Sequence, residues 1–398
     1  MSDLLARLRA LQGASPDERP AEEAVGPAWQ VEAAALDAVV VEGREGVHLL
    51  RRAWQPPGTR HGVAPLGDGS IHPFLERWAD RVGVPRVGGR QRVVYVDTET
   101  TGLAGGTGTY VFLAGVGVHD DEGFLVEQLL LPGPQYERAW LHALAERLAE
   151  STVLVTFNGA SFDVPLLRTR FALHGVTDPT EGVVHVDLLP LARRWWGRSL
   201  VNCTLGTIER EVLGVQRSQL DVPGAEVPAR YRAYLRTRDA TLLEGVVTHN
   251  VDDIVALAAL QRRLEASFDG SHGTLGKPRD AHEGFGVARW LEALGEVEEA
   301  ARRHEAWMEE HDEAAFAIAR IWRREGNVEA ARGAWTRLAE RGHAEAWVEL
   351  AKLREHVDGD FEGALEATER AGQAGGGVRD DLARREARLK RRLARREG

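Results

Sequence analysis

The chain has 398 residues, of which 43% are hydrophobic and 28% charged, and its formal net charge is −11 at pH 7. This length predicts two or three domains, and the single cysteine, Cys203, excludes an internal disulfide and a cysteine-rich zinc site. No apolar run reaches membrane-span length and no signal peptide is recognisable, so we expect a cytoplasmic protein without a membrane partner. The acidic balance argues mildly against a nucleic-acid binder, unless basic residues cluster locally or metal ions neutralise the site.

The first 90 residues show little regular patterning. Segment 15–23 is polar and contains prolines, which is typical of a loop or a disordered region. The apolar runs 38–41 and 47–50 have the length of short strands. We therefore expect residues 1–90 to be a partly disordered lead-in that packs on the following domain.

Residues 91–268 are expected to form one α/β domain, because strand and helix patterns alternate along them. The predicted strands are 93–96, 110–118, 124–131, 153–157 and 183–186, and the predicted helices are 135–148, 162–173 and most of the segment up to 264. Three strands followed by helix, strand, helix and strand indicate a mixed sheet with flanking helices.

Two carboxylates follow the first buried strand of this domain. Asp97 and Glu99 are two residues apart, so on an extended chain they point to the same side. Neighbouring like charges are unfavourable unless a cation lies between them, and carboxylate oxygens suit Mg²⁺ or Mn²⁺. For this pair alone, a solvated strand end followed by a glycine turn is the alternative.

A third carboxylate, Asp163, stands at the start of the helix that follows the strand 153–157. An aspartate at this place often serves only to cap the helix or to stabilise its first turn. Because the strand ends of one sheet should lie near Asp97 and Glu99, we predict Asp163 to be a further metal ligand.

The segment 249–260 has the apolar spacing of a helix packed on a core. His249 and Asp253 are four residues apart, so they share one face of this helix. Asp253 is a fourth ligand candidate. An isolated histidine is usually structural, but beside Asp253 it becomes a candidate to deprotonate or to orient a water.

These three segments together resemble the DEDD 3′–5′ exonuclease superfamily of the ribonuclease H-like fold. Residues 97–102 look like its Asp-x-Glu-Thr-Thr-Gly motif, and residues 158–163 are similar to its Asn-x-x-Phe-Asp motif. The spacing of His249 and Asp253 is that of the tyrosine-containing third motif, whereas the histidine branch places these residues five apart. More closely, the chain resembles the YprB-like group of predicted exonucleases. The supporting segments are 112–115, 185–189, 193–196, 213–215, 221–224 and 249–250.

The resemblance implies a chemistry and a set of site residues. It implies two Mg²⁺ or Mn²⁺ ions held by the four carboxylates Asp97, Glu99, Asp163 and Asp253. His249 would act either as a general base or as the group that positions water. The residues expected to contact or frame the terminal nucleotide are Thr101, Gly102, Leu103, Asn158 and Phe162.

Residues 283–398 carry a weak repeat. Gly295, Gly326 and Gly359 each begin a Gly-x-x-Glu-x-Ala pattern, and they lie 31 and 33 residues apart. Tetratricopeptide-type helix pairs repeat about every 34 residues, and a glycine can end the first helix of such a pair. We therefore predict an all-α tetratricopeptide-like domain that offers a surface to a protein partner. A plain helical bundle that supports the nuclease domain is an equally weighted alternative.

The predicted function is a metal-dependent 3′–5′ exonuclease that hydrolyses single-stranded DNA or RNA from its 3′ end. Two alternatives stay open. One is a catalytically inactive ribonuclease H-like scaffold that binds a protein partner through its helical repeats. The other is a structure-selective endonuclease on the same fold. All four acidic positions are filled, and this favours an enzyme over the scaffold.

Overall fold

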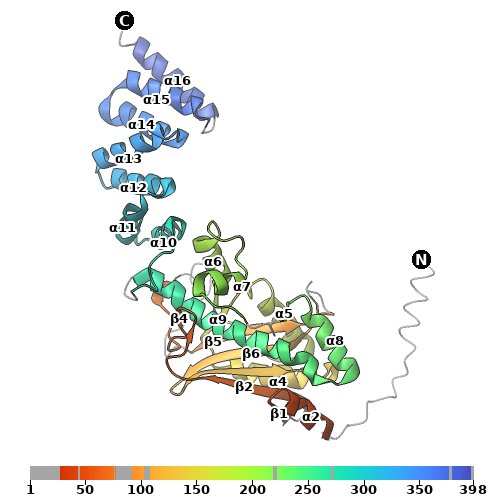
Figure 1. The fold of residues 1–398 in the computed structure, drawn as a ribbon. Coiled ribbons are helices and arrows are strands. Elements are labelled where there is room, and N and C mark those ends of the chain that lie inside the picture. Colours follow the sequence, from red (N-terminus) through yellow and green to blue (C-terminus); the bar gives the residue numbers. More distant parts are fainter. Residues whose placement is uncertain are drawn as a thin grey trace, which may run out of the picture.

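A computed structural model describes residues 27–43, 45–75, 77, 92–102, 108–217, 222–269, 273–375 and 379–395. The predicted loop 15–23 and the predicted nucleotide contact Leu103 lie outside these ranges. Figure 1 shows a sheet flanked by helices, from which a second set of helices rises toward the C-terminus.

Seven strands form one mixed sheet in the order β1-β2-β7-β6-β5-β8-β9. Their bounds are β1 (Ala38–Gly43), β2 (Gly46–Gln55), β5 (Val93–Thr100), β6 (Val111–Asp120), β7 (Gly123–Leu130), β8 (Val153–Thr156) and β9 (Val184–Asp187). Neighbours from β1 to β5 run antiparallel, whereas β5, β8 and β9 run parallel. This arrangement confirms the predicted α/β fold with a mixed sheet.

Both faces of the central strand β5 are buried. Successive side chains of a strand point to opposite faces, so those of β5 enter two different core clusters. Val94 and Val96 pack in one core cluster with residues of α4 (Glu137–Leu148) and α5 (Asp163–His174). Val93 and Tyr95 pack in the other with residues of α6 (Leu188–Trp196) and α9 (Glu244–Asp269). The strand continues to Thr100, so Asp97 and Glu99 lie inside β5 and not beyond its end.

Shorter elements complete this part of the chain. They are α2 (Pro27–Ala35), β3 (Arg60–His61), β4 (Ala64–Pro65), η1 (Pro134–Tyr136), α7 (Leu205–Ile208), η2 (Glu209–Leu213), α8 (Val227–Thr237) and η3 (Ala240–Leu243). Strands β1 and β2 come from the predicted lead-in and belong to the same sheet as β5. The domain boundaries at residues 90, 268 and 283 remain a prediction.

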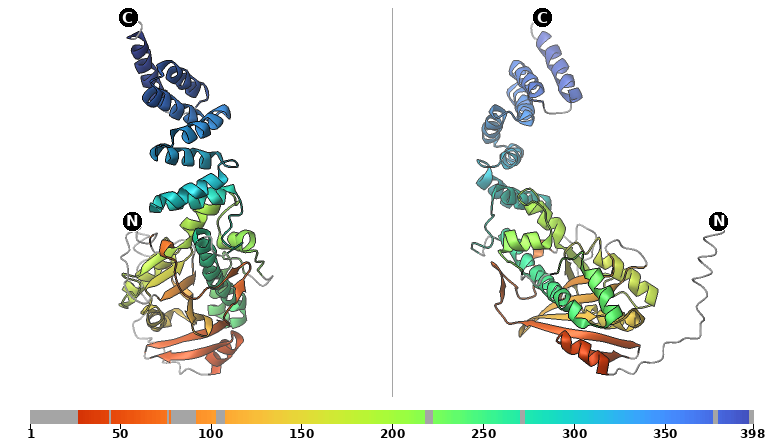
Figure 2. Two further views of the ribbon diagram at one scale, coloured as in Figure 1. Left: turned by 90° about the vertical axis from the view of Figure 1, so that its left-hand side faces the viewer. Right: turned by 45° about the vertical axis from the view of Figure 1, so that its right-hand side comes forward.

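The C-terminal part is an array of packed helix pairs. Its elements are α10 (Ala281–Leu294), α11 (Val297–Trp307), α12 (Asp312–Arg324), α13 (Val328–Glu340), α14 (Ala344–Leu353), η4 (Arg354–Asp358), α15 (Phe361–Gln373) and α16 (Arg379–Ala394). Both views of Figure 2 show this array leading away from the sheet. Gly295, Gly326 and Gly359 adopt positive φ between the paired helices, as the repeat predicted. In the described part of the chain, no helix is long and apolar enough to span a bilayer.

The β3–β4 hairpin closely approaches the end of η2. The backbone N–H of Val63 donates to the carbonyl of Leu213 at 2.8 Å. Gly62 has φ of +60°, and a Cβ added there would lie 1.9 Å from the same carbonyl oxygen. Gly58 has φ of +80°, but its added Cβ would meet no described atom within 4 Å.

We therefore expect Gly62→Ala to destabilise the protein far more than Gly58→Ala. Both substitutions place an alanine in the left-handed region, which costs about 1 kcal/mol of stability each. Only Gly62→Ala also forces the hairpin away from Leu213, for a total loss of about 3 kcal/mol or more. Urea unfolding followed by circular dichroism measures the difference. Equal losses for the two variants would contradict the close contact.

Candidate active site

The first two predicted motifs lie where parallel strands end. Asp97 and Glu99 lie in the last half of β5, Asn158 follows β8, and Asp187 ends β9. Because parallel strands share a direction, their carboxyl ends lie at the same edge of the sheet, where α/β proteins commonly bind ligands. The structure thus brings the first two motifs to one edge.

Asp97 is held by an amide on α9. The Asn250 side chain, which is fully buried, donates from Nδ2 to Asp97 Oδ2 at 2.8 Å. Gln128 on β7 in turn donates from Nε2 to Asn250 Oδ1 at 2.9 Å. Gly115 pairs with Asp97 in the sheet, and a Cβ there would lie 2.4 Å from Asn250 Oδ1. A glycine is therefore needed to let α9 bring this amide against β5.

Asp163 is the first residue of α5, and it is 6% exposed. Its Oδ1 accepts a hydrogen bond from the hydroxyl of Thr98, which lies between the two carboxylates of β5 in sequence. The position before the helix belongs to Phe162, which is half-buried and makes no side-chain cap. Asp163 is thus a first-turn residue, and its carboxylate is oriented by β5.

Asp187 organises the loop that precedes α5. Its carboxylate accepts hydrogen bonds from the backbone N–H groups of Asn158 at 2.8 Å, Ala160 at 3.2 Å and Leu189 at 3.0 Å. The last of these caps α6. Asn158 is exposed and adopts the left-handed conformation, with φ of +66°. One side chain therefore fixes both a helix start and the loop of the second motif.

His249 and Asp253 lie on one face of α9, as their spacing predicts. His249 Nε2 is 3.4 Å from Asp253 Oδ2. Arg217 also contacts both residues: it is paired with Asp253 Oδ1, and its Nη1 lies 3.0 Å from His249 Nδ1. Arg217 Nε donates to Glu209 Oε2 at 2.7 Å. Neither Arg217 nor Glu209 belongs to one of the predicted motifs.

The electrostatics of the four carboxylates are linked. Burial raises the pKa of Glu99 to about 8 and the pKa of Asp163 to about 6, and Asp253 adds to both shifts. Burial also raises the pKa of Asp97 well above its usual range, with Asp253, Glu99 and Asp163 contributing in that order. The pKa of Asp253 is raised by burial, although Arg217 and His249 oppose the shift. Gathering these groups is unfavourable unless positive charge compensates them.

The positions of these carboxylates do not form a complete coordination shell. Among the described residues, no three carboxylate, imidazole or thiolate groups are arranged closely enough to hold a metal ion. The donors nevertheless suit a hard divalent cation, because they are carboxylate oxygens that are partly or fully buried and repel one another. Metal ligation by Asp97, Glu99, Asp163 and Asp253 stays a prediction.

The turn after β5 carries the expected nucleotide contacts. The Thr101 carbonyl accepts a hydrogen bond from Arg232 Nη1 at 3.1 Å, and the Thr101 N–H donates to the Tyr110 carbonyl at 3.1 Å. The Thr100 hydroxyl donates to the Gly102 carbonyl at 2.8 Å. Thr101 and Gly102 are thus held at the same edge as the carboxylates.

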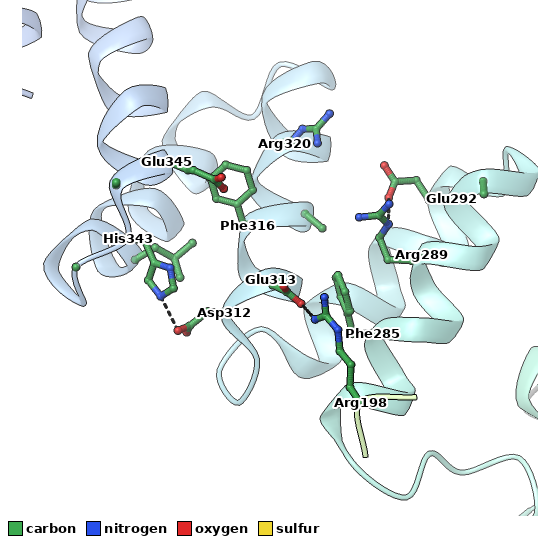
Figure 3. A pocket seen from close by; sticks show the side chains of 15 residues that line it. Arg198, Phe285, Arg289, Glu292, Asp312, Glu313, Phe316, Arg320, His343 and Glu345 are labelled. Atoms are coloured by element: carbon green, nitrogen blue, oxygen red, sulfur yellow. Dashed lines mark hydrogen bonds and ion pairs between the residues drawn. The ribbon is translucent and has the colours of Figure 1, made fainter. Parts of the chain in front are cut away.

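A separate groove of about 860 Å³ lies on the helical array (Figure 3). Phe285 and Arg289 of α10 and Phe316 and Arg320 of α12 line it. The two pairs are 31 residues apart, so they occupy equivalent positions in consecutive repeats. Arg198, which follows α6, pairs across the groove with Glu313. This groove is a candidate surface for the partner that the repeats predict.

We expect Asp187→Ala to cost about 3 kcal/mol of stability, because three backbone N–H groups lose a charged acceptor. Asp239 is a suitable control, because it caps η3 through Thr241 alone. Asp239→Ala should cost only about 1 kcal/mol. Urea unfolding of both variants tests the difference. Equal costs would mean that Asp187 acts only as a helix cap.

Comparisons with known proteins identify the family of this chain. The RNase_H superfamily matches residues 94–265. The uncharacterized protein YprB of Bacillus subtilis (strain 168) is 32% identical over 342 residues, which cover 81% of this chain and 80% of YprB. The family B DNA polymerase from the hyperthermophilic archaeon Pyrobaculum calidifontis aligns with 58% of this chain and 36% of its own length, at 18% identity and a TM-score of 0.38. That likeness is too slight to support a conclusion. The chain belongs to the family of YprB, and its α/β part is an RNase H superfamily domain.

Proposed function

We propose that this protein is a metal-dependent 3′–5′ exonuclease acting on single-stranded nucleic acid. RNase H superfamily members are typically phosphodiester hydrolases and generally use divalent metals. The observation that carries the proposal is the set of four electrostatically linked carboxylates, which come from β5, α5 and α9. A scaffold without catalytic function has no physical reason to bear the cost of burying them together.

Asp97, Glu99, Asp163 and Asp253 would hold two Mg²⁺ or Mn²⁺ ions. Such ions, when bound, lower the pKa of a water and stabilise the charge that develops on the leaving oxygen. The hydrogen bonds from Asn250 and Thr98 leave the other oxygen of Asp97 and of Asp163 available for a ligand. The fold thereby orients two donors before any ion arrives.

The remaining residues act on water and on the nucleotide. His249 would either accept a proton from the attacking water or orient that water, since it lies one helical turn from Asp253. Thr101, Gly102, Leu103, Asn158 and Phe162 would contact the terminal nucleotide. Asn158 is exposed and Phe162 is half-buried at this edge of the sheet, which suits contact with a nucleotide. The groove on the helical array supports the further proposal of a protein partner.

Asp163→Asn is expected to abolish cleavage, because it removes a charged metal ligand. The asparagine side-chain oxygen can still accept the hydrogen bond from Thr98. The assay uses 5′-labelled single-stranded DNA and RNA with Mn²⁺ or Mg²⁺, and the products are separated on a gel. Exposed Asp121 gives the control, and Asp121→Asn should leave the rate unchanged.

The proposal expects a ladder that shortens from the 3′ end with the wild type and none with Asp163→Asn. A single internal cut would support an endonuclease. No cleavage of either polymer would favour the inactive scaffold.

His249→Ala should lower the turnover rate by about 10²-fold or more if the imidazole is a general base. Thr248 is an exposed neighbour on the same helix, and Thr248→Ala serves as the control for changes in α9 itself. Single-turnover kinetics at saturating metal measure both variants. A loss below about tenfold would rule out the general-base role and leave the orienting role.

A further inference from the structure

Arg217 places one guanidinium against both residues of the third motif. It follows η2, and its side chain is 12% exposed. The group is paired with Asp253 Oδ1, and its Nη1 lies 3.0 Å from His249 Nδ1. No other described arginine or lysine is paired with any of the four carboxylates. Arg217 is therefore a fixed positive charge inside the candidate site.

Glu209 also anchors Arg217, through the same Nη2 that is paired with Asp253. Arg217 Nη2 lies 2.5 Å from Glu209 Oε2, and Glu209 is only 1% exposed. The other oxygen, Glu209 Oε1, lies 2.9 Å from His61 Nε2 on the β3–β4 hairpin. Arg217 thus has two anionic partners, and one of them is held in place by a part of the chain outside the predicted nuclease domain.

Both oxygens of Asp253 face groups of the protein itself. Oδ1 is taken by Arg217, and Oδ2 lies 3.4 Å from His249 Nε2. Burial works against the charge of Arg217, but Asp253 and Glu209 outweigh it and raise the pKa of Arg217, so the guanidinium stays charged. A divalent cation that approached Asp253 would meet this positive charge, and the two would repel each other.

We propose that Arg217 competes with a divalent metal ion for Asp253 and so weakens metal binding at the site. The inference rests on the proposed metal-dependent function. When Asp253 binds a metal ion, Arg217 keeps Glu209 as its partner. Two divalent ions then balance the four carboxylates, and Arg217 balances Glu209, so that no buried charge is left alone. Arg217 is a positioning residue, because it acts through Asp253 and not on the substrate.

The competition predicts tighter metal binding when Arg217 is removed. The apparent affinity of a ligand falls in proportion to the fraction of protein whose site is free. Removing Arg217 as the competitor should therefore lower the dissociation constant of the metal ion about tenfold or more. Arg217→Gln alone leaves Glu209 buried with one partner fewer. The double variant Arg217→Gln/Glu209→Gln removes both charges, and it keeps the test valid if the single variant folds poorly.

Calorimetry with Mn²⁺ alone, on EDTA-treated full-length protein, tests the proposal. Arg217→Gln and the double variant should bind Mn²⁺ more tightly than the wild type, and Arg217→Lys should bind it nearly as the wild type does. Exposed Arg210, which pairs with Glu211, gives the control Arg210→Gln. Before Mn²⁺ is added, the melting temperature of Arg217→Gln should be lower than that of the wild type. Saturating Mn²⁺ should reduce this difference in melting temperature.

Unchanged or weaker Mn²⁺ binding by Arg217→Gln and by the double variant, with normal binding by the wild type, would overturn the competition and leave the proposed function standing. It would mean that Arg217 only orients Asp253. If the wild type binds no Mn²⁺ and matches Asp163→Asn, both the competition and the metal-dependent function fail.

Discussion

The repulsion among four carboxylates at one edge of the sheet is the constraint on which the site depends. Asp97, Glu99, Asp163 and Asp253 come from three elements. Burial raises the pKa of each of them, and Asp253 adds to the shifts of the other three. Each has a compensating neighbour or is placed to receive one. Asn250 donates to Asp97, Thr98 donates to Asp163, and Arg217 pairs with Asp253. These contacts lower the cost of the arrangement without cancelling it, and a divalent cation would supply the charge that is still missing.

The fold supplies the geometry by ordinary packing. Parallel strands β5, β8 and β9 end at one edge, and Asp187 ties the loop after β8 to the start of α6. Gly115 lets α9 approach β5 closely enough for Asn250 to reach Asp97. The same helix continues to Asp269, toward the helical array, and Figure 1 shows it crossing the sheet. Near its end, α9 contacts α10 through the Arg263–Glu283 ion pair, and α6 packs against α10 beside it.

The sequence predicted the mixed sheet, the helix pairs and the convergence of the motifs on one edge, because these follow from periodicity and strand direction. It placed Asp97 and Glu99 beyond a strand that in fact continues through them. It did not identify Gln128, Glu209 or Arg217 as part of the site, since their partners lie far away in sequence and only tertiary packing brings them together. Of these three residues, only Gln128 left a signal, because it and Glu127 are polar residues in a strand that is otherwise apolar.

The most direct test of the central claim is anomalous diffraction at the manganese absorption edge, from crystals of the wild-type protein grown with Mn²⁺. We expect anomalous peaks at the carboxyl end of β5, in contact with Asp97 and shared with Glu99, Asp163 and Asp253. Arg217 should then be paired with Glu209 and no longer with Asp253. Density without a peak at this edge, or a peak bound only by other residues, would contradict the assignment of these four carboxylates as one metal site.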